Sequence, residues 1–533
     1  MAHAYRRQPF VTPPELRGGR TEAPVAIVGA GPVGLALAID LALRGVASVV
    51  LDDNDVVSVG SRAICWAKRT LEIFDRLGVG GRMLAKGVTW ARGRVFHGDN
   101  PVYAFDLLPE DGHCYPAFVN LQQYHVEAYL IDRARDFPGL IDLRFLNRVT
   151  GHRDTGDGVV LEVETPEGAY ALEARYLVAC DGAGSPVRGR MGLRWEGQTF
   201  EEQFLIADIE MADSPFAGAG AERWFWFDPT FHPGKSALLH QQPDDIYRID
   251  LQLPADVDGK AEATEDRVIP RIRAIVGDRP FRLDWMSVYR FRCIRLERFV
   301  HGRVIFCGDA AHVVSPFGAR GGNGGIQDAD NLGWKLAAVL AGQAGPALLD
   351  SYDAERGFAA DENILNSARA TNFMTPKTPI EALFRAEALR LAQGEPFAQR
   401  LLNSGRLSVP CVLAGFPLFT PGEAPLPPGS ALRDAPVSGG WLLPRVQQGD
   451  FVLLGVGVHL PDVPGVRRLG VGVGAGYPVV TDDAGLVAAR YGAGLAYLFR
   501  PDGHVAAVFR DPKPGAVRAA RARALGYLSE EPA

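Results

Sequence analysis

The sequence predicts an α/β protein of two or three domains, and three observations lead to this expectation. Residues 25–53 have the pattern of a short apolar strand, a glycine-rich turn, an apolar helix and a second strand. Residues 195–292 contain short alternating runs with many aromatic side chains, which is typical of a β-sheet layer. A stretch rich in Pro and Gly, residues 417–430, precedes a smaller C-terminal unit of short strands and one basic helix.

The glycine-rich turn follows the pattern G-x-G-x-x-G, with its glycines at Gly29, Gly31 and Gly34. Such a turn lets a pyrophosphate approach the backbone at the start of a helix, where free N–H groups favour negative charge. Asp52 ends the second strand, at the spacing expected of a carboxylate that binds a ribose hydroxyl. The segment therefore predicts a dinucleotide site; a βαβ turn that binds nothing is the alternative.

The composition excludes several classes of protein. The chain has 533 residues, of which 47% are hydrophobic and 22% charged, and no apolar run is long enough to cross a bilayer. A net charge of −7 argues against nucleic acid as a partner. The six cysteines form no C-x-x-C pair, which favours reduced thiols in a cytoplasmic protein and argues against a structural zinc site. Residues 1–24 lack the apolar core of a secretory signal and are expected to form a flexible arm.

Two further apolar strands end in acidic motifs. The predicted strand at residues 176–180 ends at Asp181-Gly182, and the one at residues 303–307 ends at Gly308-Asp309. Ligands of open α/β sheets bind at the carboxyl ends of the strands, so these motifs and the glycine turn are expected at one site. Asp309 could instead be a simple helix cap.

Together the three motifs resemble those of the group A FAD-dependent aromatic hydroxylases, which have the p-hydroxybenzoate hydroxylase fold. The resemblance covers about residues 24–400 and is strongest toward the 3-(3-hydroxyphenyl)propionate, phenol and nitrocatechol hydroxylases. It implies a Rossmann-like FAD-binding domain with an inserted β-sheet substrate domain and a C-terminal thioredoxin-like α/β domain. The expected boundaries are 1–24 for the arm, 25–194 and 293–402 for the FAD-binding domain, 195–292 for the substrate domain, 403–432 for a linker and 433–533 for the thioredoxin-like domain.

The resemblance also implies a set of FAD-binding residues. Pro316 would lie beside the isoalloxazine ring, and the loop before the next helix would direct N–H groups at it. Arg62 and Gln123 could alternatively be a solvated arginine and a helix cap. This chain has Arg320 in a loop where the family reads more like G-Q-G-M-N, so Arg320 would add a charge near the flavin. The implied cofactor-binding residues are Gly29, Gly31, Gly34, Asp52, Arg62, Gln123, Asp181, Gly308, Asp309, Gly321, Gly322 and Asn323.

The implied activity is hydroxylation of a phenol or another electron-rich aromatic compound. NADH or NADPH would reduce FAD, and O2 would add to give a C4a-hydroperoxyflavin that transfers oxygen to the ring. His240, Tyr289 and His113 are candidates for the base that deprotonates the phenol, and His312 is expected to be structural. The run Trp224-Phe225-Trp226-Phe227 is expected to form a wall of the substrate chamber. A homodimer is possible.

Two other functions stay open at this point. The first is another flavoenzyme on the same scaffold, a halogenase or a dehydrogenase. The run at residues 224–228 resembles the W-x-W-x-I-P signature of halogenases only superficially, because Asp228 stands where that signature has isoleucine. The second is a protein that binds FAD without turnover.

Overall fold

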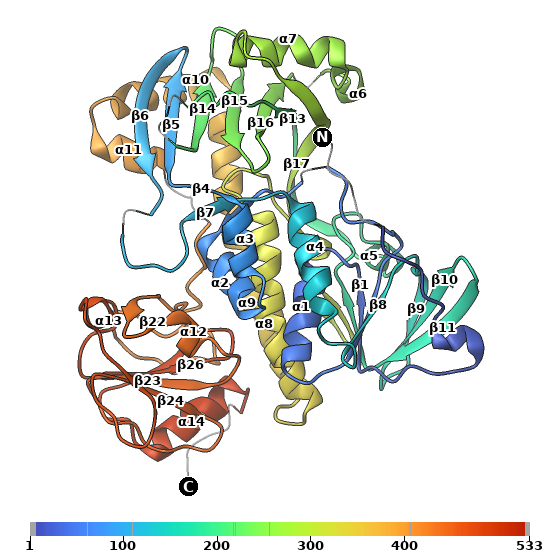
Figure 1. The fold of residues 1–533 in the computed structure, drawn as a ribbon, viewed down its shortest axis with the longest axis vertical. Helices are drawn as coiled ribbons and strands as arrows, with labels where there is room; N and C mark the ends of the chain where they lie inside the picture. The colour runs from blue at the N-terminus through green and yellow to red at the C-terminus, as the bar shows by residue number, and fades with distance from the viewer. Residues whose placement is uncertain are drawn as a thin grey trace.

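The computed structural model describes residues 7–60, 62–108, 110–216, 218, 220–254, 256–403 and 408–527. Its long helix α8 (Gly321–Leu340) runs through the middle of the molecule. One mixed sheet lies at the upper end of this helix, a second, mostly parallel sheet lies beside it, and the C-terminal domain packs against the opposite side (Figure 1). Helix α8 therefore touches all three parts of the fold.

The parallel sheet confirms the predicted βαβ unit. Strand β1 is buried on both faces, and the helix that follows it, α1, covers one face and packs against α8. Strand β8 (Ile141–Arg144) pairs parallel to β2 and also belongs to this sheet. The strand order is β18 (Val300–His301), β19 (Val304–Phe306), β12 (Tyr176–Ala179), β1 (Val25–Val28), β2 (Ser48–Leu51) and β8 (Ile141–Arg144), with α1 at Pro32–Leu43 and α4 at Gln123–Ala134.

The predicted substrate layer is an eight-stranded sheet that is larger than expected. It takes β5 and β6 from the first part of the chain and β20 from beyond residue 293, so the predicted range 195–292 covers only its centre. The strand order is β20 (His312–Val313), β17 (Arg282–Leu296), β13 (Trp195–Glu210), β16 (Ile246–Leu253), β15 (Ser236–Gln241), β14 (Glu222–Phe227), β5 (Arg92–His97) and β6 (Asn100–Asp106).

The two faces of this sheet have different partners. Helices α6 (Gly259–Glu262) and α7 (Glu265–Val276) lie on the outer side, whereas α10 (Pro379–Ala392) and α11 (Pro396–Asn403) join the cluster on the inner side. Side chains alternate between the faces of a strand, so the aromatic run of β14 is divided. Trp224 and Trp226 pack in the outer cluster, and Phe225 and Phe227 in the inner one. The expected aromatic wall is thus supplied by the phenylalanines alone.

Two small sheets complete the FAD-binding part. A hairpin is present at residues 159–174. Residues 7–24, expected as a flexible arm, dock on its sheet, where Arg20 pairs with Glu173 of β11, and on the larger sheet, where Glu15 pairs with Arg144 of β8. One sheet contains β9 (Arg148–Asp154), β10 (Val159–Thr165) and β11 (Gly168–Ala174), and is joined by η1 (Pro14–Arg17); the other contains β3 (Cys65–Ala67), β7 (Phe118–Asn120) and β4 (Val88–Trp90). The remaining helices are α2 (Lys68–Arg76), α3 (Gly80–Lys86), α5 (Pro186–Arg190), α9 (Leu348–Met374) and the short η2 (Gly308–Ala310).

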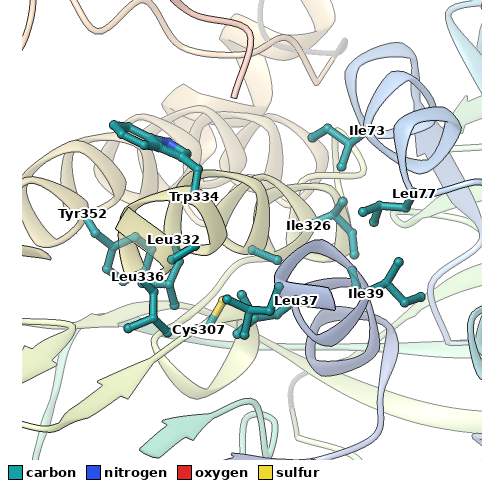
Figure 2. Close-up of a cluster of buried hydrophobic side chains, with 14 of the residues drawn as sticks. Leu37, Ile39, Ile73, Leu77, Cys307, Ile326, Leu332, Trp334, Leu336 and Tyr352 are labelled. Carbon is teal, nitrogen blue, oxygen red and sulfur yellow. The ribbon is translucent and has the colours of Figure 1, made fainter. Parts of the chain in front are cut away.

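The main core lies where α1, α2 and α8 meet. Figure 2 shows Leu37 and Ile39 of α1 facing Ile326 and Leu332 of α8, with Ile73 of α2 beside them. Each of these side chains is almost completely buried, which stabilises the fold by roughly 1.5–3 kcal/mol per side chain. This packing fixes the start of α8 relative to the glycine turn that precedes α1.

The C-terminal domain is a five-stranded mixed sheet with helices, as the expected α/β class requires. The predicted linker differs from expectation, because its second half pairs with this domain: the N–H groups of Thr420 and Gly429 donate to Ala506 and Val505. The strand order is β25 (Val479–Val480), β24 (Arg467–Val471), β23 (Val452–Val456), β26 (Leu495–Phe499) and β27 (Val505–Phe509), with β21 (Pro436–Val437), β22 (Gly440–Trp441), α12 (Leu443–Val446), α13 (Leu486–Tyr491) and α14 (Pro514–Ala524). Among the described residues, no helix is long and apolar enough to cross a membrane.

Candidate active site

The glycine turn has the shape that a dinucleotide requires. Gly29 has a φ of +105°, and a Cβ there would lie 2.4 Å from the carbonyl oxygen of Cys180. A Cβ on Gly34 would lie 2.1 Å from the carbonyl oxygen of Gly29, so this glycine lets α1 pack against β1. A Cβ on Gly31 would meet nothing within 4 Å. The open space therefore lies in front of Gly31, at the start of α1, where a pyrophosphate would bind.

Asp52 stands at the end of β2, as predicted, and it also holds the turn. Its Oδ2 accepts a hydrogen bond of 2.7 Å from the N–H of Ala30, and its Oδ1 accepts one of 2.9 Å from the N–H of Asn54. Desolvation by burial raises the pKa of Asp52 despite these bonds. The carboxylate is half-buried, which leaves it accessible to a ribose hydroxyl.

Gln123 and Arg62 have different roles. Gln123 holds the loop before β3: its Oε1 accepts from the N–H of Ala63 at 3.1 Å, and its Nε2 donates to Ser58 and Glu127. Gln123 therefore supports the loop internally, and its expected contact with the nucleotide stays a prediction. Arg62 is exposed at the end of this loop. Its positive charge lies close enough to Asp309 and Tyr289 to oppose the rise of their pKa values.

The two acidic motifs lie beside the glycine turn, because a Cβ on Gly29 would meet the backbone of Cys180 and Asp181. Asp309 is exposed to solvent, yet desolvation by the surrounding protein atoms raises its pKa. Gly308 has a φ of +64°, and a Cβ there would lie 3.0 Å from Val33, so the G-D motif touches the glycine turn. Asp181 accepts from the N–H of Val187, whereas its Oδ1 is buried without a partner.

The loop before α8, residues 314–320, is the one expected beside a flavin, and we call it the flavin-side loop. Pro316 is exposed, and Ala319 turns the chain with a φ of +53°. Gly321 and Gly322 begin α8, whose first N–H groups have no acceptor within the helix and favour negative charge. The side chain of Asn323 bonds the backbone of β3, at Ala67 N–H and Cys65 C=O, both at 2.9 Å, and the expected contact of this residue with the cofactor stays a prediction.

Arg320 bonds helix α9. It is buried, its Nη1 donates to Asn363 of α9 at 2.7 Å, and its expected charge near the flavin stays a prediction. Burial lowers the pKa of Arg320. His312 is structural, as predicted, because its Nε2 contacts Asp328 Oδ2 of α8 at 2.6 Å in the interior.

A polar cluster lies on the inner face of the eight-stranded sheet, and we call Cys65, Arg223, His240 and Asp250 the chamber cluster. His240 Nε2 lies 3.7 Å from Asp250 Oδ2, too far for a hydrogen bond, and His240 Nδ1 lies 3.9 Å from Cys65 Sγ. Arg223 Nη1 donates to the same sulfur at 3.8 Å. Burial lowers the pKa of His240 to about 4, so the imidazole is neutral at pH 7.

The chamber cluster has unused hydrogen-bonding capacity. His240 Nε2, Asp250 Oδ1 and Arg223 Nε are buried without a hydrogen-bond partner. Arg223 makes no ion pair within the described part of the chain and instead lies over Phe225, with its Cζ 5.1 Å from the ring centroid. Phe317, from the loop after Pro316, stacks edge-on against Phe204 of the same sheet face at 5.3 Å. The cluster therefore shares an aromatic face with the flavin-side loop.

The other two base candidates lie elsewhere. Tyr289 is 42% exposed in the middle of β17, beside Asp309, and desolvation raises its pKa, so it stays a neutral phenol. His113 lies in a loop beside the C-terminal domain, where the neighbouring Arg490 donates to the carbonyl of Gly112. Its candidacy as a base stays a prediction.

A cavity of about 520 Å³ opens beside Tyr289. It is bounded by Ala183, which follows the D-G motif, and by the basic side chains Lys260, Arg290 and Arg292. Sequence reasoning missed these residues and also Arg223 and Asp250. Side chains alternate along each strand, but alternation alone does not show which strands are neighbours. The observed register of β14, β15 and β16 brings residues 223, 240 and 250 together on one face.

Comparisons with known proteins agree with this geometry. Residues 22–367 match the FAD binding domain family. A flavin-dependent monooxygenase of Mycobacteroides abscessus is 34% identical over 349 residues, which are 62% of this chain and 70% of the relative. A probable NADH-specific resorcinol 4-hydroxylase of Rhodococcus jostii is 29% identical over 94% of each chain. The structure of the anhydrotetracycline hydroxylase OxyS of Streptomyces rimosus has a TM-score of 0.70 and 29% identity, covering 94% of this chain and 99% of that one.

The glycine turn, the exposed Asp309 and the unpartnered Asp181 oxygen fit an FAD molecule laid along the cleft. The family match spans well over half of the chain, and the relatives are flavin-dependent monooxygenases. The chain therefore belongs to the FAD binding domain family and is an FAD-dependent monooxygenase.

Proposed function

We propose that the protein hydroxylates a phenolic substrate held between the flavin-side loop and the chamber cluster, using NADH or NADPH as the reductant. The observation that supports this proposal most is the unused polar capacity of His240 and Asp250 on an aromatic face. Buried polar atoms without partners are uncommon in native proteins, and a ligand is one group that satisfies them. A phenol offers both a ring for the aromatic face and a hydroxyl for the polar pair.

The names of the relatives favour the same substrate class. One relative acts on resorcinol and others on 3-(3-hydroxyphenyl)propionate or 3-hydroxycinnamic acid, and each of these compounds is a phenol. The anhydrotetracycline hydroxylase acts on a larger polycyclic phenol. These activities belong to those proteins, and they support the proposal here through the shared fold alone.

The residues of this chain would bind, orient and deprotonate the phenol. When bound, FAD would supply the oxidising chemistry, because no side chain carries an electrophilic oxygen. Asp250 stays ionised, since contacts with His240 and nearby arginines lower its pKa. Its free Oδ1 would accept the hydroxyl proton or its hydrogen bond, and the neutral His240 would orient the group. Loss of the proton makes the ring more electron-rich.

Exclusion of water is the second task of the chamber. Phe204, Phe291 and Phe317 pack within 5.3 Å of one another between ring centroids and close the inner face beside the loop. A dry chamber strengthens electrostatic contacts and prevents loss of the reactive oxygen to solvent.

We propose that the nicotinamide nucleotide docks at the 520 Å³ cavity beside Tyr289. Lys260, Arg290 and Arg292 supply positive charge suited to phosphate groups, and Ala183 connects the cavity with the D-G motif. Arg292→Gln should therefore raise the KM for NADH without changing the affinity for the phenol, and Arg282→Gln, an exposed arginine outside the cavity, is the matched control.

Two further expectations are also proposals. The six cysteines are free thiols, which favours a cytoplasmic location. The possible homodimer stays a prediction, and size-exclusion chromatography with light scattering would test it.

The experiment for the proposed function follows reductant consumption and H2O2 release together in the purified FAD-loaded enzyme. We expect a phenol to accelerate NADH or NADPH oxidation while H2O2 stays below the amount of hydroxylated product. An O-methylated analogue of the same ring is the control, because it lacks the acidic hydroxyl. The proposal is wrong if the phenol and its methyl ether give the same rate and the same product yield.

A further inference from the structure

The hairpin loop of the C-terminal domain places charged side chains inside the FAD-binding part. We call residues 500–504, between β26 and β27, the hairpin loop. Arg500 and Asp502 are essentially fully buried. Arg500 binds Glu355 of α9 through two parallel contacts, Nη1 to Oε1 at 2.8 Å and Nη2 to Oε2 at 2.9 Å, and it also pairs with Asp502. Such a bidentate pair fixes the relative position of its two elements.

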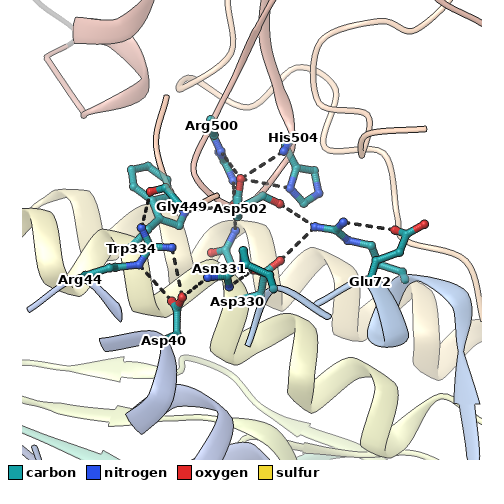
Figure 3. Close-up of polar contacts among 12 residues, drawn as sticks. Asp40, Arg44, Glu72, Asp330, Asn331, Trp334, Gly449, Arg500, Asp502 and His504 are labelled. Atoms are coloured by element: carbon teal, nitrogen blue, oxygen red, sulfur yellow. Dashed lines mark hydrogen bonds and ion pairs between the residues drawn. The ribbon is translucent and has the colours of Figure 1, made fainter. Parts of the chain in front are cut away.

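Asp502 connects the same loop to α8. Its Oδ2 accepts from Asn331 Nδ2 at 3.2 Å and from Trp334 Nε1 at 3.1 Å, and Figure 3 shows both side chains directed toward it. The backbone carbonyl of Asp502 accepts from Arg69 of α2 at 2.7 Å. The hairpin loop therefore holds α2, α8 and α9 at one point.

A second contact extends the connection to α1. Arg44 donates to Asp40 and also to the carbonyl of Gly449 in the C-terminal domain, at 2.7 Å (Figure 3). Gly333 of α8 permits the close approach of Asp40, because a Cβ there would lie 2.0 Å from Asp40 Oδ2. The helix that follows the glycine turn is thus tied to the same domain.

Helices α8 and α9 also connect to the G-D motif. Arg356, which follows Glu355 in α9, binds Asp328 of α8 at 2.6 Å. Asp328 in turn accepts from the N–H of Gly308 at 3.1 Å, next to Asp309. A continuous series of buried contacts therefore joins the hairpin loop to the G-D motif. Helix α2 continues directly from β3, whose backbone is bonded by Asn323 at the start of α8.

We propose that the hairpin loop is a positioning element for the flavin, which sets α8 and α9 so that the G-D motif and the start of α8 meet the cofactor correctly. A displaced α8 would move its N–H groups away from the flavin and stabilise the negative charge of the reduced ring less well. The C-terminal domain would then act in the chemistry without contacting the substrate.

The test uses the full-length holoenzyme with Asp502→Asn, which keeps the shape of the side chain and removes its charge. We expect the Kd for FAD to rise at least tenfold, the flavin midpoint potential to become more negative, and the share of NADH that yields H2O2 to rise at least twofold. Arg468→Gln is the matched control in the same domain, since Arg468 pairs with the exposed Asp462 away from α8. This control should leave all three values unchanged.

A conservative second variant covers the case in which Asp502→Asn does not fold. Trp334→Phe removes one hydrogen bond to Asp502 and keeps an aromatic ring, and we expect a smaller change in the same direction, about twofold in the Kd for FAD. The proposal is overturned if either variant folds with lower thermal stability but retains the wild-type flavin potential, FAD affinity and H2O2 share. Failure of phenol hydroxylation itself would be recognised separately, because the potential and the Kd for FAD are measured without a substrate.

Discussion

The chamber cluster and the hairpin loop are both buried and charged, but they differ in how completely their charges are paired. Arg500, Asp502 and Glu355 each meet an opposite charge within hydrogen-bond distance. In the chamber cluster, Arg223 has no ion pair among the described residues, and atoms of His240 and Asp250 have no hydrogen-bond partner. A network with paired charges indicates a structural role, whereas an incompletely satisfied one indicates a place for a ligand.

The largest expected effect breaks the paired network. Arg500→Met leaves Glu355 and Asp502 buried without their arginine, so the free energy of unfolding should fall by about 3–5 kcal/mol. Denaturant titration of the FAD-loaded protein measures this loss. Arg390→Met removes an exposed arginine that pairs with Glu387, and it should cost less than about 1 kcal/mol. Equal losses in the two variants would contradict the structural role of the hairpin loop.

The second largest expected effect is on the rate of phenol hydroxylation. His240→Gln should lower the rate of phenol hydroxylation on the order of 100-fold, because the neutral imidazole no longer orients the hydroxyl. The FAD content should remain that of the wild type, since His240 lies on the substrate sheet. Single-turnover product formation, measured beside bound FAD, checks both values. An unchanged rate would remove His240 from the site and leave Asp250 as the remaining candidate base.

The third effect is a dependence of stability on pH. The pKa of His240 is about 4 in the folded state, below the 6.5 of an ordinary histidine, so the folded protein resists protonation. The neutral His240 therefore contributes its full stabilisation above pH 6.5. This stabilisation is lost as the pH falls toward 4, by about 2 kcal/mol between pH 6.5 and 5. Glu355, with a pKa lowered to about 2, loses its contribution only below its unfolded pKa of 4.5. The stability of the wild type relative to His240→Gln should therefore fall by about 2 kcal/mol on acidification from pH 6.5 to 5; a stability difference that does not change with pH would contradict this assignment.

The smallest expected effect is on the stability of an arginine variant. Arg223→Met replaces an unpaired buried charge by an apolar side chain, so the free energy of unfolding should change by less than about 1 kcal/mol or increase. The same substitution at position 500 is strongly destabilising, which makes the two variants a direct comparison. A loss at position 223 as large as that at position 500 would show that Arg223 has a structural partner.

The sequence predicted the positions of the residues near the cofactor site better than those of the chamber cluster. Gly29, Asp181 and Asp309 follow directly from strands that end at one edge of a parallel sheet, so local pattern is sufficient to place them. Gln123 and Asn323 were assigned to the cofactor, and that assignment stays a prediction. Their side chains bond the backbone of Ala63 and Ala67, contacts that depend on the tertiary fold. Amide side chains can serve either purpose, and residue type alone does not distinguish them.

The parts that the sequence did not predict depend on pairing between distant strands and domains. Strands β5 and β6 join a sheet formed mainly by residues a hundred positions later, and the chamber cluster is assembled by that pairing. The hairpin loop reads as an ordinary turn, Pro501-Asp502-Gly503, and nothing local indicates that Asp502 is buried against α8. Such long-range contacts carry no periodic signal along the chain.

The most direct test of the central claim measures the origin of the oxygen in the product. The FAD-loaded enzyme is supplied with NADH, ¹⁸O2 and resorcinol or 3-(3-hydroxyphenyl)propionate, and the product is examined by mass spectrometry. The account predicts a hydroxylated ring that carries one ¹⁸O atom, with NADH consumed in equal amount. It would be contradicted if the enzyme converts these or other phenols without incorporating ¹⁸O, or if every phenol tested leaves NADH oxidation yielding H2O2 alone.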